Sequence, residues 1–401
     1  MCGNTIRTWR KRICTAVLSL TLTLLAWMST TMSSAKVGRK TPMVRPICPG
    51  PERPGEKTQQ GFDILSFPRP EYIGNFRNPC WYGHSFPDDI QSSIRCIPVF
   101  YIVGQPKCGT TDLFSKLSAH PDIADKTAYS AVHWLSRGRF KQRLIDAPPK
   151  YRPRVTFDHY ASRFRNSTNQ VERKVDLSSN IIDYHPMIIG DHSPSTFADN
   201  QHWQEYVGNE NCEEPRIINA HYLRHMIPEA KIILTLREPV SRLYSSYCYF
   251  LGDGTPEAFH ESVVRETKMY TDCFKRHSVR RCAYDNTLSG MSDMKVGMGL
   301  YSVYLEDWFQ TFPRKQIYVS FLENYSKEPE STLEEMFRFL GVSPLSRSDI
   351  QQIANATTRN IGKVRKKSQP MLAKTKALLD KFYEPFNTRL TDMLKEEPNW
   401  F

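Results

Sequence analysis

A glycine-containing loop with a single lysine is the first segment of this sequence that could bind an anion. Residues 104–111 read GQPKCGTT and lie between a short apolar run and a helical pattern. The backbone N–H groups of such a loop and the N-terminus of the following helix point at an anion, which predicts a phosphate-binding loop. In nucleotide triphosphatases the lysine directly follows the second glycine, whereas here Thr110 follows Gly109 and Lys107 lies inside the loop. Lys107 should therefore contact the terminal group of the bound anion; the alternative is a tight turn with an exposed lysine.

A second anion site is predicted where another apolar strand ends. The run 230–236 leads into Arg237, and residues 237–245 read REPVSRLYS, with Pro239 suited to the first turn of a helix. Open α/β sheets bind ligands at the carboxyl ends of their strands, so Arg237 should face the ligand. The hydroxyl of Ser245 can join the guanidinium group on one phosphate. The alternative is that this segment only caps a helix and that Ser245 is a small packing residue.

Both loops need an α/β sheet to position them. The sequence predicts strands and helices in alternation, with strands at 99–103, 231–236 and 316–321 and helices at 112–119, 240–251, 300–310 and 332–340. This order predicts a central parallel sheet flanked by helices on both faces. A terminal helix is expected over 371–394, with an interruption at Pro385.

The first 95 residues predict a membrane anchor and a stem ahead of the domain. Basic residues precede an uncharged, largely apolar run at 13–35, which predicts a cytoplasmic tail at 1–12 and a signal-anchor transmembrane helix. A proline-rich stem is expected at 36–95, followed by a lumenal domain at 96–401. This order is that of a single-pass type II membrane protein. A cleaved signal peptide is the alternative, because residues 33–35 resemble a small-residue cleavage site.

Cysteines and glycosylation sequons agree with a lumenal placement. Eight cysteines follow the apolar run, an even number that is compatible with disulfides. Cys273 and Cys282 bracket a short basic loop and are the best predicted pair in an oxidising compartment. Sequons begin at Asn166, Asn324 and Asn355.

The charge of the chain favours a polyanionic partner. The formal net charge is +12, which suits nucleic acid, acidic lipid or acidic polysaccharide. The leader segment and the sequons argue against nucleic acid. The cysteines lack the paired short spacings of a zinc site, so no metal is expected.

The two loops resemble the donor-binding motifs of the sulfotransferase family. Residues 104–111 are similar to its 5′-phosphosulfate loop, and residues 237–245 are similar to its 3′-phosphate motif. Segments 282–288, 299–308 and 380–390 narrow the resemblance to Golgi carbohydrate sulfotransferases. It implies a P-loop-type sulfotransferase fold and 3′-phosphoadenosine-5′-phosphosulfate as the sulfate donor, with no metal required.

The resemblance also implies a role for each matching residue. Lys107 would stabilise the bridging oxygen and the sulfuryl group in transfer, and Arg237 with Ser245 would hold the 3′-phosphate. The 5′-phosphate would be held by the backbone of Lys107, Cys108, Gly109, Thr110 and Thr111. Lys363 belongs to a basic run that the resemblance implies lies near the 3′-phosphate.

The implied acceptor is a sulfated glycosaminoglycan in the Golgi lumen. The resemblance implies transfer to the 6-hydroxyl of N-acetylgalactosamine 4-sulfate in chondroitin or dermatan sulfate. A basic cluster is expected to contact the polymer: Arg137, Arg139, Lys141 and Arg143. Two alternatives stay open, a sulfotransferase acting on another glycan such as heparan sulfate, and a catalytically weak lumenal protein that binds the donor or the glycan.

The sequence offers two candidates for the general base. Related enzymes carry a glutamate just before a His-Trp pair, whereas this chain has Ala131 ahead of His133 and Trp134. Asp191 is the first candidate, because it follows an apolar run that should end a strand near the donor. His133 is the second, since a neutral imidazole can accept a proton near neutral pH. The alternative for each is a packed, hydrogen-bonded side chain.

Overall fold

The predicted parallel sheet is present and contains four strands. In the computed structural model the spatial order is β4-β3-β5-β6, and all three neighbouring pairs are parallel. The bounds of the strands are Phe100–Gly104 for β3, Gly190–His192 for β4, Lys231–Leu236 for β5 and Ile317–Phe321 for β6. Most of their residues are buried, as expected for a sheet that helices cover on both faces. The α/β class and the three strands predicted from the sequence are therefore confirmed.

The structure describes residues 65, 69–83, 93–124, 131–140, 157–250, 255–292, 294–357, 369–395 and 400. The predicted tail at 1–12, the predicted anchor at 13–35 and Lys363 lie outside these residues. Within the described part of the chain, no helix is both long enough and apolar enough to cross a membrane.

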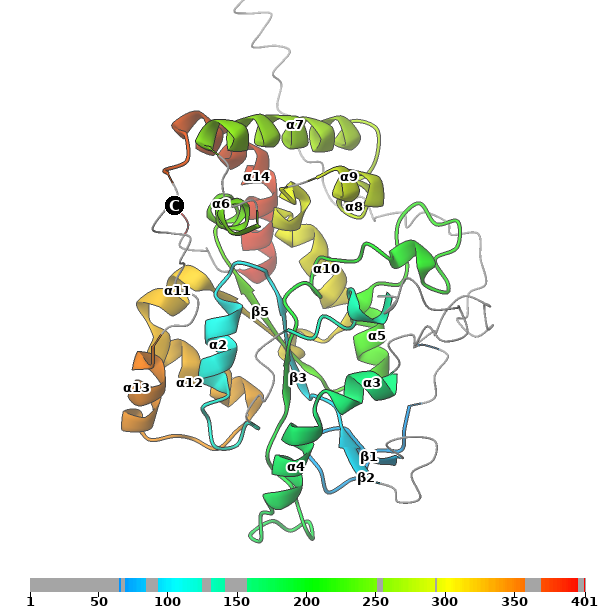
Figure 1. Ribbon diagram of the computed structural model, residues 1–401, viewed down its shortest axis with the longest axis vertical. Coiled ribbons are helices and arrows are strands. Elements are labelled where there is room, and N and C mark those ends of the chain that lie inside the picture. Colours follow the sequence, from blue (N-terminus) through cyan, green and yellow to red (C-terminus); the bar gives the residue numbers. More distant parts are fainter. Residues whose placement is uncertain are drawn as a thin grey trace, which may run out of the picture. The chain divides into compact units, whose positions relative to one another are not determined.

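Helices cover the two faces of the sheet with two separate apolar clusters. Ile102 and Ile233 point toward α2 (Thr110–Leu117) and α12 (Pro329–Leu340), whereas Tyr101 and Ile232 belong to the cluster on the opposite face. This division follows from the alternation of side chains along a strand. Figure 1 shows α2 and α12 on one side of the strands, with α5 (Asn219–Met226) and α10 (Tyr301–Thr311) on the other.

The remaining helices complete these two layers and the end of the domain (Figure 1). Their bounds are Phe157–Ser162 for α3, Arg165–Arg173 for α4, Pro239–Phe250 for α6, Pro256–Phe274 for α7, Val279–Ala283 for α8, Asn286–Met291 for α9, Leu322–Lys327 for α11, Arg347–Asn355 for α13 and Ala373–Leu394 for α14.

The expected interruption of the last helix is wrong. Helix α14 runs through Pro385 without a break. Proline lacks the N–H that would bond to the preceding turn, so an isolated helix would bend or end there. Leu379 and Tyr383 before the proline and Leu390 after it are all buried in one apolar cluster. Burial of one continuous face on both sides of Pro385 thus outweighs the lost hydrogen bond.

A disulfide-linked hairpin packs against the domain just ahead of β3. Strands β1 (Cys80–Gly83) and β2 (Ser93–Cys96) are antiparallel, and Cys80 is bonded to Cys96. Trp81 is buried and stacks on Phe157 of α3, with ring centroids 5.4 Å apart. These residues of the segment predicted as a stem are therefore part of the folded unit.

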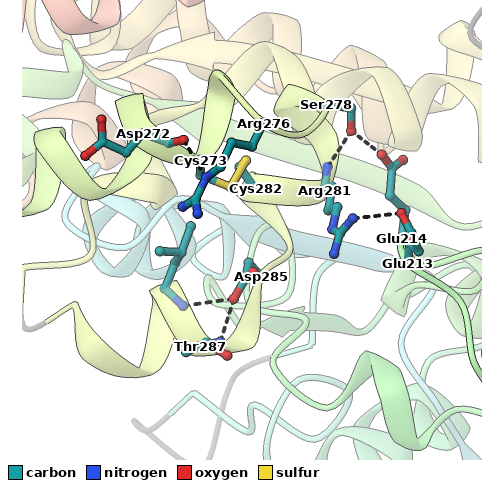
Figure 2. The surroundings of a disulfide bond; sticks show 11 residues. Glu213, Glu214, Asp272, Cys273, Arg276, Ser278, Arg281, Cys282, Asp285 and Thr287 are labelled. Carbon is teal, nitrogen blue, oxygen red and sulfur yellow. Dashed lines mark hydrogen bonds and ion pairs between the residues drawn. A yellow bond between two sulfur atoms is a disulfide. The ribbon is translucent and has the colours of Figure 1, made fainter.

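The predicted pairing of Cys273 with Cys282 is confirmed (Figure 2). The bond joins the end of α7 to α8. Ser278 begins α8 by accepting a hydrogen bond from the Arg281 amide, and Arg281 also forms an ion pair with Glu213 at 2.7 Å. The disulfide therefore closes the basic turn between α7 and α8, and the ion pair holds this turn against the segment that contains Glu213.

Candidate active site

The loop between β3 and α2 has the backbone geometry of an anion-binding turn. Lys107 and Gly109 both adopt left-handed conformations, with φ of 70° and 73°. The positive φ of Gly109 favours glycine, and a Cβ atom there would lie 2.6 Å from Leu322 Cδ1, which would have to shift. The Leu113 amide donates to the Gly109 carbonyl at 3.0 Å, which is the first backbone bond of α2. The amides of the first turn therefore have no carbonyl partner within the helix and can donate to a ligand.

Lys107 and Arg237 lie at the same edge of the sheet. Strands β3 and β5 are parallel neighbours, with Gly104 opposite Leu234, so the loops that follow them leave side by side. The pKa of Lys107 is lowered, first by burial and then by the positive charge of Arg237. The two cations are thus close enough to repel each other, and an anion between them would relieve that repulsion.

A tyrosine covers the ammonium group of Lys107. The Lys107 Nζ lies 3.5 Å from the centre of the Tyr249 ring, in the last turn of α6. Tyr249 itself is 57% exposed. A cation over an aromatic face is attracted by the ring quadrupole, so this contact holds the lysine in the absence of a ligand.

Helix α6 places Arg237 and Ser245. Glu238 caps the helix, since its carboxylate accepts hydrogen bonds from the amides of Val240 at 2.9 Å and Ser241 at 2.6 Å. The hydroxyl of Tyr301 donates to the Arg237 carbonyl at 3.0 Å. Capping by Glu238 leaves the Arg237 side chain, which is half-buried, to meet a ligand; Ser245 is half-buried two turns farther along.

Sequence reasoning gave no role to Arg242, which lies on the inner face of α6. Its side chain is fully buried and donates to the Lys295 carbonyl at 3.2 Å. Burial raises the pKa of the nearby Cys108 thiol to about 12, and the charges of Arg242 and Arg237 oppose that rise. Cys108 is therefore a neutral thiol, and its backbone amide donates to the Gln105 carbonyl at 3.2 Å. An arginine between Val240 and Leu243, on the apolar face of the helix, was the available signal.

Asp191 is buried in a network of hydroxyl groups. It lies in β4, opposite Tyr101 of β3, and is 4% exposed. Its carboxylate accepts hydrogen bonds from Tyr160 at 2.8 Å and Ser193 at 2.6 Å. Burial and the charge of Asp191 raise the pKa of Tyr160 well above its usual range, so the phenol remains a donor.

His133 reaches the same network from a separate segment. Its backbone amide donates to Ser193 Oγ at 2.9 Å, and its ring Nδ1 lies 2.5 Å from Ser195 Oγ. Ser195 in turn contacts Ser136 at 2.6 Å. Ser193 therefore links the two residues predicted as candidate bases, Asp191 and His133, although they are far apart in the sequence.

His192 contacts the anion-binding loop from the other face of β4. Its Nε2 lies 3.2 Å from Thr110 Oγ1 at the start of α2, and its ring stacks on Phe114. Asp191 and His192, which are consecutive in β4, thus point to opposite faces of the sheet, because side chains alternate along a strand.

The basic cluster predicted to contact the polymer is only partly described. Arg137 forms an ion pair with Asp199, and the Arg139 guanidinium lies over the rings of Tyr206 and Tyr222. Arg139 is thus engaged within the domain rather than presented to a polymer. Lys141, Arg143 and Lys363 fall outside the described residues. Over the described ranges, no group of three or more His, Cys, Asp or Glu side chains could hold a metal ion.

The chain is similar to known members of the sulfotransferase family. The sequence profile of the family described as "Sulfotransferase domain" matches residues 98–390, and the chain belongs to this family. Carbohydrate sulfotransferase 15 from mouse is 35% identical over 309 residues, which cover 76% of this chain and 54% of that protein. The human protein of the same name is 34% identical over 316 residues. The predicted resemblance to carbohydrate sulfotransferases is therefore confirmed.

More distant similarities were also found. A bifunctional heparan sulfate N-deacetylase/N-sulfotransferase from Drosophila melanogaster is 22% identical over 320 residues, covering 75% of this chain and 26% of that protein. A solved sulfotransferase from Alicyclobacillus acidocaldarius is 21% identical, with a TM-score of 0.48, and covers 76% of this chain and 98% of its own. The chain spans about half the length of the carbohydrate sulfotransferases that it matches.

Proposed function

We propose that this chain transfers a sulfuryl group from 3′-phosphoadenosine-5′-phosphosulfate to a hydroxyl of a sulfated glycosaminoglycan. The proposed acceptor is the 6-hydroxyl of N-acetylgalactosamine 4-sulfate in chondroitin or dermatan sulfate. The observation that carries the proposal is the placement of Lys107 and Arg237 at the ends of adjacent parallel strands, within electrostatic reach of each other. A donor with phosphate groups at both ends of one nucleoside needs two such cations at one edge.

The residues of the two loops divide the work of binding and transfer. The backbone of Lys107, Cys108, Gly109, Thr110 and Thr111 would hold the 5′-phosphate. Lys107 would leave the Tyr249 ring and neutralise the bridging oxygen as its bond to sulfur breaks and the acceptor oxygen bonds to sulfur. Arg237 and Ser245 would hold the 3′-phosphate, and Lys363 would support them.

The acceptor hydroxyl must also lose its proton during transfer. Asp191 could take it through the hydroxyl of Ser193, which already donates to its carboxylate, while Tyr160 donates a second hydrogen bond that positions the carboxylate. His133 could instead take it directly at Nε2, with Nδ1 held by Ser195. Ser193 accepts from the backbone amide of His133, so it does not connect the imidazole to the carboxylate, and Asp191 and His133 are alternative bases. Either residue would stand in for the glutamate that Ala131 replaces.

The proposed location is the Golgi lumen, with residues 13–35 as the membrane anchor. Support comes from the basic residues ahead of that apolar run, which favour a cytosolic N-terminus. The disulfides Cys80–Cys96 and Cys273–Cys282 agree with an oxidising compartment.

Labelled donor and defined acceptors test the function. The purified chain is incubated with ³⁵S-labelled donor and chondroitin 4-sulfate, chondroitin 6-sulfate or heparan sulfate, and the products are digested to disaccharides. We expect label at the 6-position of N-acetylgalactosamine 4-sulfate, and its loss in Lys107→Met. Label in heparan sulfate alone would show that the acceptor is heparan sulfate and not chondroitin or dermatan sulfate. Binding of the donor without transfer to any acceptor would favour the binding protein that Ala131 suggests.

A further inference from the structure

A polar pocket lies close to the anion-binding loop after β3. Its volume is about 410 Å³, including space open to solvent. Its lining includes residues 198–201 after β4, helix α9 and residues 295–298 ahead of α10, together with residues of α7, α8 and α10. Asn200, Ser289 and Lys295 are among the polar residues of the lining.

The pocket shares its wall with the anion-binding loop. The Gln105 side chain, fully buried in that loop, donates from Nε2 to the carbonyl of Met298 in the pocket lining at 2.7 Å. The Phe197 amide donates to the Val103 carbonyl at 2.8 Å, which fixes the start of the segment 198–201 at the end of β3. A ligand in the pocket would therefore lie next to the loop that carries Lys107.

Asn200 presents a hydrogen-bond donor that the described protein does not use. The side chain is 4% exposed and lines the pocket. Its Oδ1 accepts from the Asn219 amide at 2.9 Å, which fixes the orientation of the group. Its Nδ2 is buried and has no partner among the residues that the structure describes. A buried donor without a partner is costly, so a ligand acceptor at this position would be favoured.

Lys295 supplies a positive charge to the same space. Its ammonium donates to the Ser289 carbonyl at 2.7 Å, and two further N–H bonds remain for other acceptors. Asp199, the acidic side chain in the described lining, forms an ion pair with Arg137. The remaining charge of the lining is thus positive.

The segment that carries Lys295 is held rigidly from behind. The buried carboxylate of Glu266 accepts from the amides of Met294 at 2.8 Å and Val296 at 3.3 Å. Gly297 packs so closely on Tyr270 that a Cβ atom would lie 2.1 Å from the phenol oxygen. Because its backbone is fixed, Lys295 is preorganised for a ligand, which lowers the entropic cost of binding.

We infer that this pocket binds an anionic sugar unit of the acceptor polymer. Lys295 contacts a sulfate or carboxylate group of that unit, and Asn200 Nδ2 donates to one of its oxygen atoms. Amide, hydroxyl and ammonium donors around tyrosine rings match the hydroxyl groups and the charge of a sulfated saccharide. This inference rests on the proposed function, since it assigns a subsite for the acceptor of that reaction.

Two variants test the subsite, and a third serves as a control. Lys295→Met removes the charge and keeps the length of the side chain. Asn200→Asp keeps the oxygen that Asn219 needs and replaces the unpartnered donor with an acceptor. Lys395→Met is the matched control, because Lys395 also has a positive φ, of 56°, but is exposed at the end of α14.

The measurement is equilibrium binding in the presence and absence of a chondroitin 4-sulfate hexasaccharide. Each variant is titrated first with 3′-phosphoadenosine 5′-phosphate, the desulfated donor, and then with the hexasaccharide. We expect Lys295→Met and Asn200→Asp each to weaken hexasaccharide binding by about tenfold or more. Nucleotide affinity should stay within about twofold of wild type, and Lys395→Met should match wild type for both ligands.

The other outcomes separate the subsite from the function. Wild-type protein that binds neither nucleotide nor hexasaccharide would overturn the proposed function and the subsite together. Wild-type binding of both, with unchanged hexasaccharide affinity in Lys295→Met and Asn200→Asp, would overturn the subsite alone. Weakened nucleotide binding with normal hexasaccharide binding would also overturn it, by assigning the pocket to a donor phosphate. Should Lys295→Met fail to fold, Asn200→Asp gives the same decision.

Discussion

The ammonium group of Lys107 lies on the face of the Tyr249 ring, 3.5 Å from its centre. The lysine comes from the loop after β3, and the tyrosine comes from the last turn of α6, the helix that follows Arg237. The contact therefore joins the two predicted halves of the donor site through one pair of side chains. It also stabilises the charged form of the lysine, whereas burial and Arg237 favour the neutral form.

Replacing the ring should lower the pKa of Lys107 further. In Tyr249→Leu the ammonium loses its aromatic partner, so we expect its pKa to fall by roughly half a pH unit, because such a contact contributes about 0.5–1 kcal/mol at an exposed site. Tyr249→Phe keeps the ring face and should leave the value unchanged. NMR of isotopically labelled lysine side chains in the ligand-free protein measures both variants. Equal pKa values in Tyr249→Leu and wild type would show that the ring does not stabilise the charge.

Removing Arg237, the second cation, should raise the pKa of Lys107. Arg237 lowers the pKa of Lys107, so Arg237→Gln should raise it. The lysine then stays protonated to higher pH. The alkaline fall in the pH profile of kcat/KM should therefore shift to higher pH, even though the affinity for the sulfate donor decreases. Arg338→Gln, which removes an exposed arginine of α12, is the control. A Lys107 that titrates at the same pH in Arg237→Gln as in wild type would contradict the shared site.

The catalytic role proposed for Asp191 can be tested by comparison with Tyr160, which donates a hydrogen bond to its carboxylate. Asp191→Asn should lower kcat by at least about 100-fold while the nucleotide affinity changes little, because general base catalysis contributes about 10²- to 10⁴-fold. Tyr160→Phe breaks a hydrogen bond to the same carboxylate but leaves the carboxylate in place, so we expect a loss in kcat of less than tenfold. Steady-state kinetics and titration with the desulfated donor measure these effects. Equal losses in kcat would make Asp191 a positioning residue, and full activity of Asp191→Asn would remove it from the mechanism.

The Cys273–Cys282 disulfide should stabilise the domain without affecting donor binding. Closing a loop of this length contributes about 2–3 kcal/mol in the chain-entropy model, since the cysteines are 9 residues apart. We therefore expect the double variant Cys273→Ser/Cys282→Ser to lose that much of the free energy of unfolding in urea. Cys248→Ser, at a free cysteine, is the control. A double variant as stable as wild type would show that the ion pair and hydrogen bonds in Figure 2 hold this turn unaided.

Asp122 should stabilise the fold at neutral pH but not in acid. Burial raises its pKa, but hydrogen bonds from Lys174 and Ser343 outweigh this effect and lower the pKa to about 2. A carboxylate with a depressed pKa stabilises the fold above its unfolded-state pKa, near 4, and loses that effect as the pH falls toward 2. Asp122→Asn should therefore lose about 1–2 kcal/mol at pH 7, after allowance for the partly exposed Lys174, and less at pH 3. Urea unfolding at both pH values checks this, with exposed Asp392→Asn as the control; a pH-independent loss would contradict it.

The sequence predicted those parts of the site that depend on local pattern. A loop between an apolar strand and a helix, and an arginine at the end of the next buried strand, are recognisable because their spacing follows from strand and helix geometry. The pairing of Cys273 with Cys282 was predictable for the same reason, since few residues separate them. Two predictions failed or fell short where tertiary packing decides: α14 continues through Pro385, and Arg139 is covered by tyrosine rings.

Contacts between distant segments could not be predicted from the sequence. Asp191 and His133 were chosen separately, and only the folded chain shows that Ser193 touches both. The orientation of the Asn200 side chain, whose Nδ2 has no partner among the described residues, is fixed by the Asn219 backbone, which no spacing rule places beside it.

Strand β4 couples two parts of the candidate site through its alignment with β3. Gly190 lies opposite Phe100, and a Cβ atom at that position would lie 2.2 Å from the Phe100 ring. A larger residue would push β4 away from its neighbour, withdrawing Asp191 from Tyr160 and His192 from Thr110 in one displacement. A lesion at Gly190 would therefore disturb the proposed proton acceptor Asp191 and the contact of His192 with the anion-binding loop at the same time.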